Sequence, residues 1–81
     1  MELARLIRNF DEHECARRNA LRDKPADLML AAGSVGMVVD TLENGEAYLV
    51  EFGNRGPDQC DWLGVLYASE IELLPVVAKA A

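Results

Sequence analysis

The residues best suited to chemistry lie in one short run, Asp11-Glu12-His13-Glu14-Cys15, which contains every ligand type that zinc accepts. Their spacing argues against a metal ion. On a helix, His13 and Cys15 are two positions apart and point about 200° away from each other, so they do not share a ligand. We therefore interpret the run as the solvated end of a helix and predict no metal site.

Neither cysteine has the setting of a catalytic nucleophile, which needs a thiolate beside a base. Asp58 and Asp61 lie close to Cys60, and their charge disfavours its thiolate, while Cys15 lies in an acidic run. A pairing of Cys60 with His13 across the fold is the one alternative that the sequence leaves open. The chain contains no Gly-x-Ser-x-Gly, P-loop or dinucleotide-binding motif. We predict a non-enzyme without catalytic residues or cofactors.

The composition is that of a small acidic domain. The chain has 81 residues, of which 51% are hydrophobic, and a net charge of −6, so we expect one folded domain over residues 1–81. No apolar run reaches the roughly 18 residues of a membrane span, and the first residues lack the apolar core of a signal peptide. We expect a cytoplasmic protein with free thiols and no membrane contact.

Charge is unevenly distributed along the chain. Residues 1–24 carry six bases and five acids, whereas residues 25–81 carry two bases and nine acids. Such an acidic surface repels phosphate and attracts basic proteins, which makes nucleic acid the less favoured ligand. The arginines of the first segment and the Gly33-Ser34-Val35-Gly36 turn keep an RNA-binding alternative open, because Gly-x-x-Gly turns can clamp a nucleic-acid backbone.

Hydrophobic periodicity predicts an N-terminal helix over residues 1–16. The apolar positions of one face follow the spacing i, i+3, i+4, i+7 and are Leu3, Leu6, Ile7 and Phe10. Lys24-Pro25 interrupts any helix that follows. We expect the apolar face to dock on the rest of the domain or to form the interface of a homodimer.

From residue 37 onward the pattern is that of strands. Asn44-Gly45 predicts a hairpin between residues 37–42 and 47–52, because both turn residues tolerate the positive φ of a type I′ turn. With these two residues in the loop, one face of the hairpin is apolar and the other mixed. The pairs on the apolar face are Met37 with Phe52, Val39 with Val50, and Thr41 with Tyr48. Those on the mixed face are Val38 with Glu51, Asp40 with Leu49, and Leu42 with Ala47.

Two further strands are predicted in the C-terminal third. Residues 60–68 are nearly all apolar, so both faces of this strand need cover. A tight turn at Ser69-Glu70 follows, and residues 71–74 form a last strand that ends at Pro75 or continues at a sheet edge. Short strands at this spacing predict a mainly β protein, a small barrel of about five strands over residues 19–77 with an added N-terminal helix.

The stretch RDKPADLMLAAGSVGMVVDTLENGEAYLVEF, followed by a Trp-containing strand and ASEIELL, resembles a family of small bacterial proteins catalogued as domain of unknown function 4926. The resemblance covers roughly residues 20–75. It implies an SH3-like barrel similar to KOW-type domains, and it implies no activity. The helix over residues 1–16 and the loop over residues 53–59 depart from the family pattern.

The last strands carry the candidate binding residues, since SH3-like barrels often recognise peptides through aromatic side chains rimmed by acids. We predict a non-catalytic interaction module for a basic protein partner, of which an antitoxin- or immunity-type inhibitor is one form. The candidate contacts are Trp62, Tyr67, Asp58, Asp61, Glu70 and Glu72. A core position is the favoured reading for Trp62, and the two readings of Tyr67 are evenly balanced. The alternatives are a KOW-like RNA- or ribosome-binding domain and a small-ligand pocket between helix and barrel.

Overall fold

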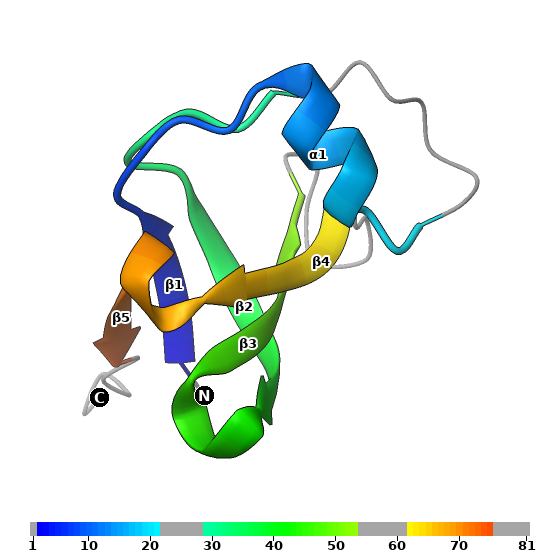
Figure 1. Ribbon diagram of the computed structural model, residues 1–81. Helices are drawn as coiled ribbons and strands as arrows, with labels where there is room; N and C mark the ends of the chain where they lie inside the picture. The colour runs from blue at the N-terminus through cyan, green and yellow to red at the C-terminus, as the bar shows by residue number, and fades with distance from the viewer. Residues whose placement is uncertain (1, 22–28, 54–61, 76–81) are drawn as a thin grey trace.

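The fold is described from a computed structural model over residues 2–21, 29–53 and 62–75 (Figure 1). Within these ranges the chain forms one antiparallel sheet in the strand order β4-β3-β2-β1-β5. Its strands are β1 (Glu2–Leu6), β2 (Val35–Leu42), β3 (Ala47–Phe52), β4 (Trp62–Tyr67) and β5 (Ile71–Pro75). The other elements are helix α1 (Glu12–Arg18) and the 3-10 turns η1 (Glu43–Gly45) and η2 (Ala68–Glu70). The predicted fold class, a mainly β protein of about five strands with an added helix near the N-terminus, is confirmed. The sheet is compatible with an SH3-like barrel.

The prediction of a helix over residues 1–16 is wrong in its first half. Glu2–Leu6 form β1, which pairs with β2 on one side and β5 on the other. Ala4 and Leu6 are buried while Arg5 between them is exposed, so the period of this segment is two. Pairing on both edges stabilises the strand, and this tertiary contact overrides the helical spacing.

The apolar stripe of the predicted helix is therefore divided between elements. Leu6 and Phe10 enter the core, Leu3 is half-buried and Ile7 is 58% exposed. The helix begins only after Asp11, whose Oδ1 accepts a hydrogen bond from the backbone N–H of Glu14 at 2.8 Å. This is the bond of an N-cap, which satisfies one of the free donors of the first turn.

The predicted hairpin is confirmed at its turn. Asn44 and Gly45 have φ angles of 57° and 93°, and the N–H of Glu46 donates to the carbonyl of Glu43 at 3.2 Å. These are the features of a type I′ turn. The predicted pairs Leu42–Ala47, Thr41–Tyr48 and Asp40–Leu49 are all present.

The register shifts beyond Asp40, and this part of the prediction is wrong. Val50 pairs with Val38 instead of Val39, and Val39 is 52% exposed. Such a bulge adds one residue to one strand of the pair, which turns the following side chains to the opposite face. As a result Val38 packs against the core and Met37 faces Glu51.

The C-terminal strands follow the prediction. β4 lies within the predicted range 60–68, of which residues 60–61 are outside the described chain, and η2 contains the predicted turn at Ser69-Glu70. β5 ends at Pro75, opposite Glu2 of β1, and it forms one edge of the sheet. Proline has no N–H to donate, so an edge position is where it is tolerated.

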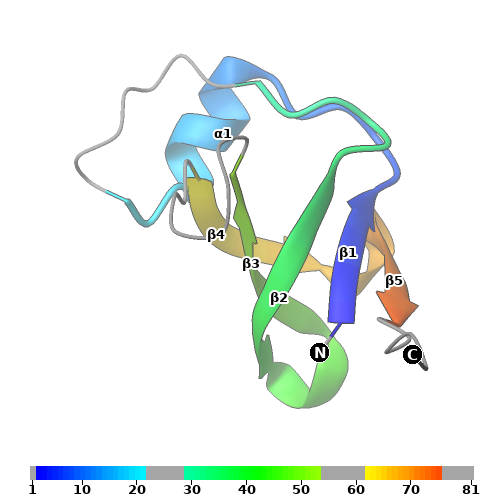
Figure 2. The same ribbon diagram turned by 180° about the vertical axis from the view of Figure 1, so that it is seen from behind.

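The core is lined mainly by the sheet: β1, β3, β4 and β5 contribute buried side chains, Val38 of β2 packs against them, and α1 contributes Cys15. Its largest fully buried side chains are Trp62, Phe10, Leu6, Leu66, Val50 and Cys15. Trp62 meets Phe52 edge-on at 5.7 Å, and its Nε1–H donates to the carbonyl of Cys15 at 2.9 Å. This bond ties α1 to β4 of the same chain. Figures 1 and 2 show α1 at one end of the molecule and the η1 turn at the other. Among the described residues, no helix is long and apolar enough to cross a membrane.

Candidate functional site

The structure places the candidate binding residues in different environments. Trp62 is fully buried in the core, which is the favoured reading, whereas Tyr67 is 50% exposed. Asp58 and Asp61 lie outside the described residues. The two glutamates of the set are engaged by arginines, and one of them is buried.

Glu70 is the buried charged residue of the described chain and belongs to η2. Its carboxylate accepts two hydrogen bonds from Arg18, at 2.6 Å from Nη1 and 2.9 Å from Nη2. Arg8 Nη2 donates a third at 2.5 Å, and the N–H of Tyr67 donates a fourth at 3.0 Å. Glu70 therefore links η2 to the segment around α1, 52 to 62 residues away in sequence, and its carboxylate is engaged within the chain.

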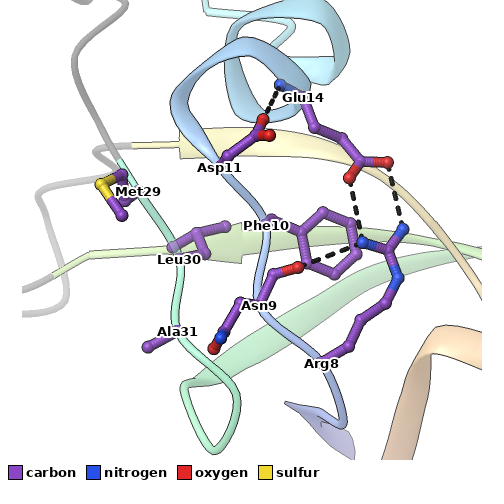
Figure 3. A pocket seen from close by; sticks show the side chains of 8 residues that line it. All are labelled: Arg8, Asn9, Phe10, Asp11, Glu14, Met29, Leu30 and Ala31. Carbon is purple, nitrogen blue, oxygen red and sulfur yellow. Dashed lines mark hydrogen bonds and ion pairs between the residues drawn. The ribbon is translucent and has the colours of Figure 1, made fainter.

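Glu14 of α1 completes this charge cluster (Figure 3). Arg8 donates to both of its oxygens at 3.0 Å, and Arg18 Nη2 donates to Oε2 at 2.8 Å. Both guanidinium groups also face the ring of Phe10, at 4.0 Å for Arg8 and 5.0 Å for Arg18. The two arginines and the two glutamates thus balance each other's charge beside the buried ring of Phe10. Their hydrogen bonds are charge-assisted, which makes them stronger than bonds between neutral groups.

The cluster holds its carboxylates ionised. Burial by itself raises the pKa of Glu70, but hydrogen bonds from Arg18, the Tyr67 backbone and Arg8 outweigh it and lower this pKa to about 2. The hydrogen bonds from Arg8 also lower the pKa of Glu14. A group with so low a pKa does not exchange protons near neutral pH, so the cluster is a structural clamp rather than an acid–base pair.

The other two arginines of the described chain also face carboxylates. Arg5 Nη2 lies 2.7 Å from Glu72 across the β1–β5 pair, and Arg17 Nη2 lies 3.5 Å from Glu14. Glu72 is therefore half of an exposed ion pair. Because every arginine in the described ranges already has an acidic neighbour, its attraction for a phosphate backbone is weakened.

The glycines of the Gly33–Gly36 turn are explained by the backbone. Gly33 has a φ of +92°, which side chains rarely adopt. A Cβ at Gly36 would lie 2.5 Å from the carbonyl oxygen of Glu51, so β2 and β3 approach each other too closely for any side chain there. Neither position needs a ligand to account for it.

A hollow of about 500 Å³ lies beside the charge cluster (Figure 3). It is lined by Arg8, Asn9, Phe10, Asp11, Glu14, Met29, Leu30 and Ala31. Its walls are held together by backbone bonds between Phe10 and Leu30, and by Asn9 Oδ1, which accepts from the N–H of Ala32 at 2.8 Å. Its polar side chains thus bond to one another or to the chain. Within the described residues, no group of three His, Cys, Asp or Glu side chains could hold a metal ion.

A different surface stands out on the outer side of β2, β3 and β4. Tyr48, Val50 and Phe52 of β3 belong to the core, so the alternating positions face outward. The strand register places them in two cross-strand rows, Asp40–Leu49–Val65 and Leu42–Ala47–Tyr67, with Glu51 beside Leu63. We call the half-buried and exposed apolar members of this set the hairpin face: Leu42, Leu49, Leu63, Val65 and Tyr67. Ala47 is not included, because it is only 2% exposed.

Four carboxylates lie along the same hairpin. These hairpin carboxylates are Asp40, Glu43, Glu46 and Glu51. In the described part of the chain none of them lies within 4.0 Å of a Lys or Arg nitrogen, and β2, η1 and β3 contain no basic residue. Sequence reasoning placed the acidic rim further along the chain, although the mixed second face of the predicted hairpin already contained Asp40, Leu49 and Glu51.

Comparisons with protein-family models, curated proteins and solved structures find no significant match.

Proposed function

We propose that this protein is a non-catalytic interaction module that binds a basic protein partner in the cytoplasm. The observation that carries the proposal is the separation of charge. The described arginines form ion pairs with Glu14, Glu70 and Glu72, whereas the hairpin carboxylates have no cationic neighbour among residues 2–21, 29–53 and 62–75. Unpaired carboxylates on one surface create a field that attracts cationic partners and speeds their association.

The same separation supports a protein partner over nucleic acid. A KOW-like RNA- or ribosome-binding function needs cations that face phosphate, and the cations of the described chain face carboxylates instead. An inhibitor of the antitoxin or immunity type is one form that such a module could take, because it would bind its target protein and perform no chemistry itself.

The test measures the binding of a fluorescent oligolysine peptide and of a single-stranded RNA at several salt concentrations. Asp40→Asn with Glu51→Gln removes two hairpin carboxylates. Glu2→Gln with Glu12→Gln is the matched control, because both residues are exposed and outside the hairpin. The hairpin variant should weaken oligolysine binding about fivefold or more relative to the control.

Two results would contradict the proposed function. One is an equal loss of oligolysine binding in both variants, which would mean that only net charge matters. The other is tighter binding of RNA than of oligolysine, which would favour the KOW-like alternative.

A further inference from the structure

We infer that the hairpin face is the docking site for an amphipathic basic helix of the partner. This inference rests on the proposed function and adds the surface and the form of the ligand. The partner would place apolar side chains on the hairpin face and Lys or Arg side chains beside Asp40 and Glu51.

The outer face of β2, β3 and β4 is apolar in character. Leu42, Leu49, Leu63 and Val65 are half-buried and Tyr67 is half-exposed. The core cluster of the described residues includes none of them, and the half-buried side chains that pack against it are Val38 and Leu73. The hairpin face is thus a second apolar layer on the opposite side of the sheet from the core. A sheet with two apolar faces usually has both of them covered.

The charge of this surface favours a cationic occupant over a second copy of the chain. Asp40 and Glu51 stand in the same cross-strand rows as Leu49 and Leu63, with no base nearby in the described chain. A symmetric dimer on this face would bring these carboxylates against their own copies, in a protein of net charge −6. Lys or Arg side chains of a basic partner would instead pair with Asp40 and Glu51.

The outer edge of β4, the last strand of the sheet, indicates the form of the ligand. A peptide could reach this surface by adding a strand to β4, but the edge is already bonded. The N–H of Ala20 donates to the carbonyl of Leu63 at 2.6 Å, and Glu70 Oε1 accepts from the N–H of Tyr67 at 3.0 Å. Because the backbone of β4 is occupied, a partner must contact side chains across the face, as an amphipathic helix does.

The test compares the binding of two synthetic peptides of identical composition by fluorescence anisotropy. One has Leu at helical i, i+3, i+4, i+7 spacing with Lys elsewhere, and the other is scrambled so that no apolar stripe forms. We expect the native protein to bind the amphipathic peptide at least about tenfold more tightly than the scrambled one. Equal binding of the two peptides would overturn the inference.

Two matched variants locate the site. Leu49→Thr with Val65→Thr keeps β-forming side chains and the charge, and should abolish the preference for the amphipathic peptide. Ile7→Thr with Val35→Thr alters exposed aliphatic residues outside the hairpin face, and this variant should still prefer the amphipathic peptide. A preference that survives in the first variant, or is lost in both, would overturn the inference.

The outcomes separate the two proposals. If the hairpin face is not the docking site but the proposed function is right, the two peptides bind with equal affinity, and Asp40→Asn with Glu51→Gln weakens the binding of both. If the proposed function is wrong, neutralising these carboxylates changes neither affinity. Circular dichroism of each variant confirms that it is folded before binding is measured.

Discussion

Substitution of Glu70 by Gln tests whether the buried charge cluster clamps the fold. The variant keeps the shape of the side chain but removes the charge that Arg8 and Arg18 share. It leaves these two guanidinium groups with Glu14 as their remaining acidic partner in the cluster. Removing one member of a buried ion pair is costly because the other charge stays desolvated and unmatched.

The magnitude follows from the pKa of the carboxyl. A shift from 4.5 to about 2 corresponds to roughly 3 kcal/mol in favour of the ionised form in the folded state. Arg8 is 44% exposed, so water screens part of this interaction, and we expect a loss of about 2 kcal/mol in the free energy of unfolding. For a domain of this size the melting temperature should fall by roughly 8–16 °C.

The assay is urea unfolding of the wild type and the variant as a function of pH. Because the folded pKa is lowered, the unfolded chain binds the proton first as the pH falls, and the stabilisation present above 4.5 disappears toward about 2. The difference in the free energy of unfolding between the wild type and the variant should therefore be largest at neutral pH and should decrease below pH 4.5. Glu72→Gln, which breaks an exposed pair with Arg5, is the control and should change stability little. A variant as stable as the wild type at neutral pH, or a gap that does not change with pH, would refute the reasoning.

Two further predictions concern packing. Gly64→Ala should destabilise the fold by about 2 kcal/mol in urea unfolding, because its Cβ would lie 2.6 Å from both the Arg18 carbonyl oxygen and the Trp62 ring. Gly33→Ala meets open space and should cost only about 1 kcal/mol for its positive φ; equal losses at the two glycines would contradict this. Burial raises the pKa of the Cys15 thiol, so in a Cys60→Ser background it should react with a thiol reagent only as fast as the chain opens. Immediate reaction in the folded state would show that the thiol is accessible.

Features with a local cause were predictable from sequence. Asn44-Gly45 fixes the hairpin turn, because few other pairs tolerate positive φ at both positions, and the register near the turn follows from it. The position of β4 follows from its apolar run. The bulge at Val39 has a cause outside the hairpin, because it lets Val38 reach the core, and no local signal in β2 marks it.

Features with a long-range cause were not predictable. Leu3, Leu6 and Phe10 satisfy the spacing of a helix, and only the pairing of this segment with β2 and β5 makes it a strand. Glu70 was expected to be a surface acid, yet its partners Arg8 and Arg18 are 62 and 52 residues away. Single-sequence patterns contain no information on which distant charges meet.

The most direct test of the account is an NMR titration of nitrogen-labelled protein with the amphipathic basic peptide. We predict that the amide signals that shift most belong to β3 and β4 around Leu49, Val65 and Tyr67, with small changes in α1. Shifts centred instead on α1 and on the hollow near Phe10 and Met29 would contradict the account and point to the pocket beside the charge cluster.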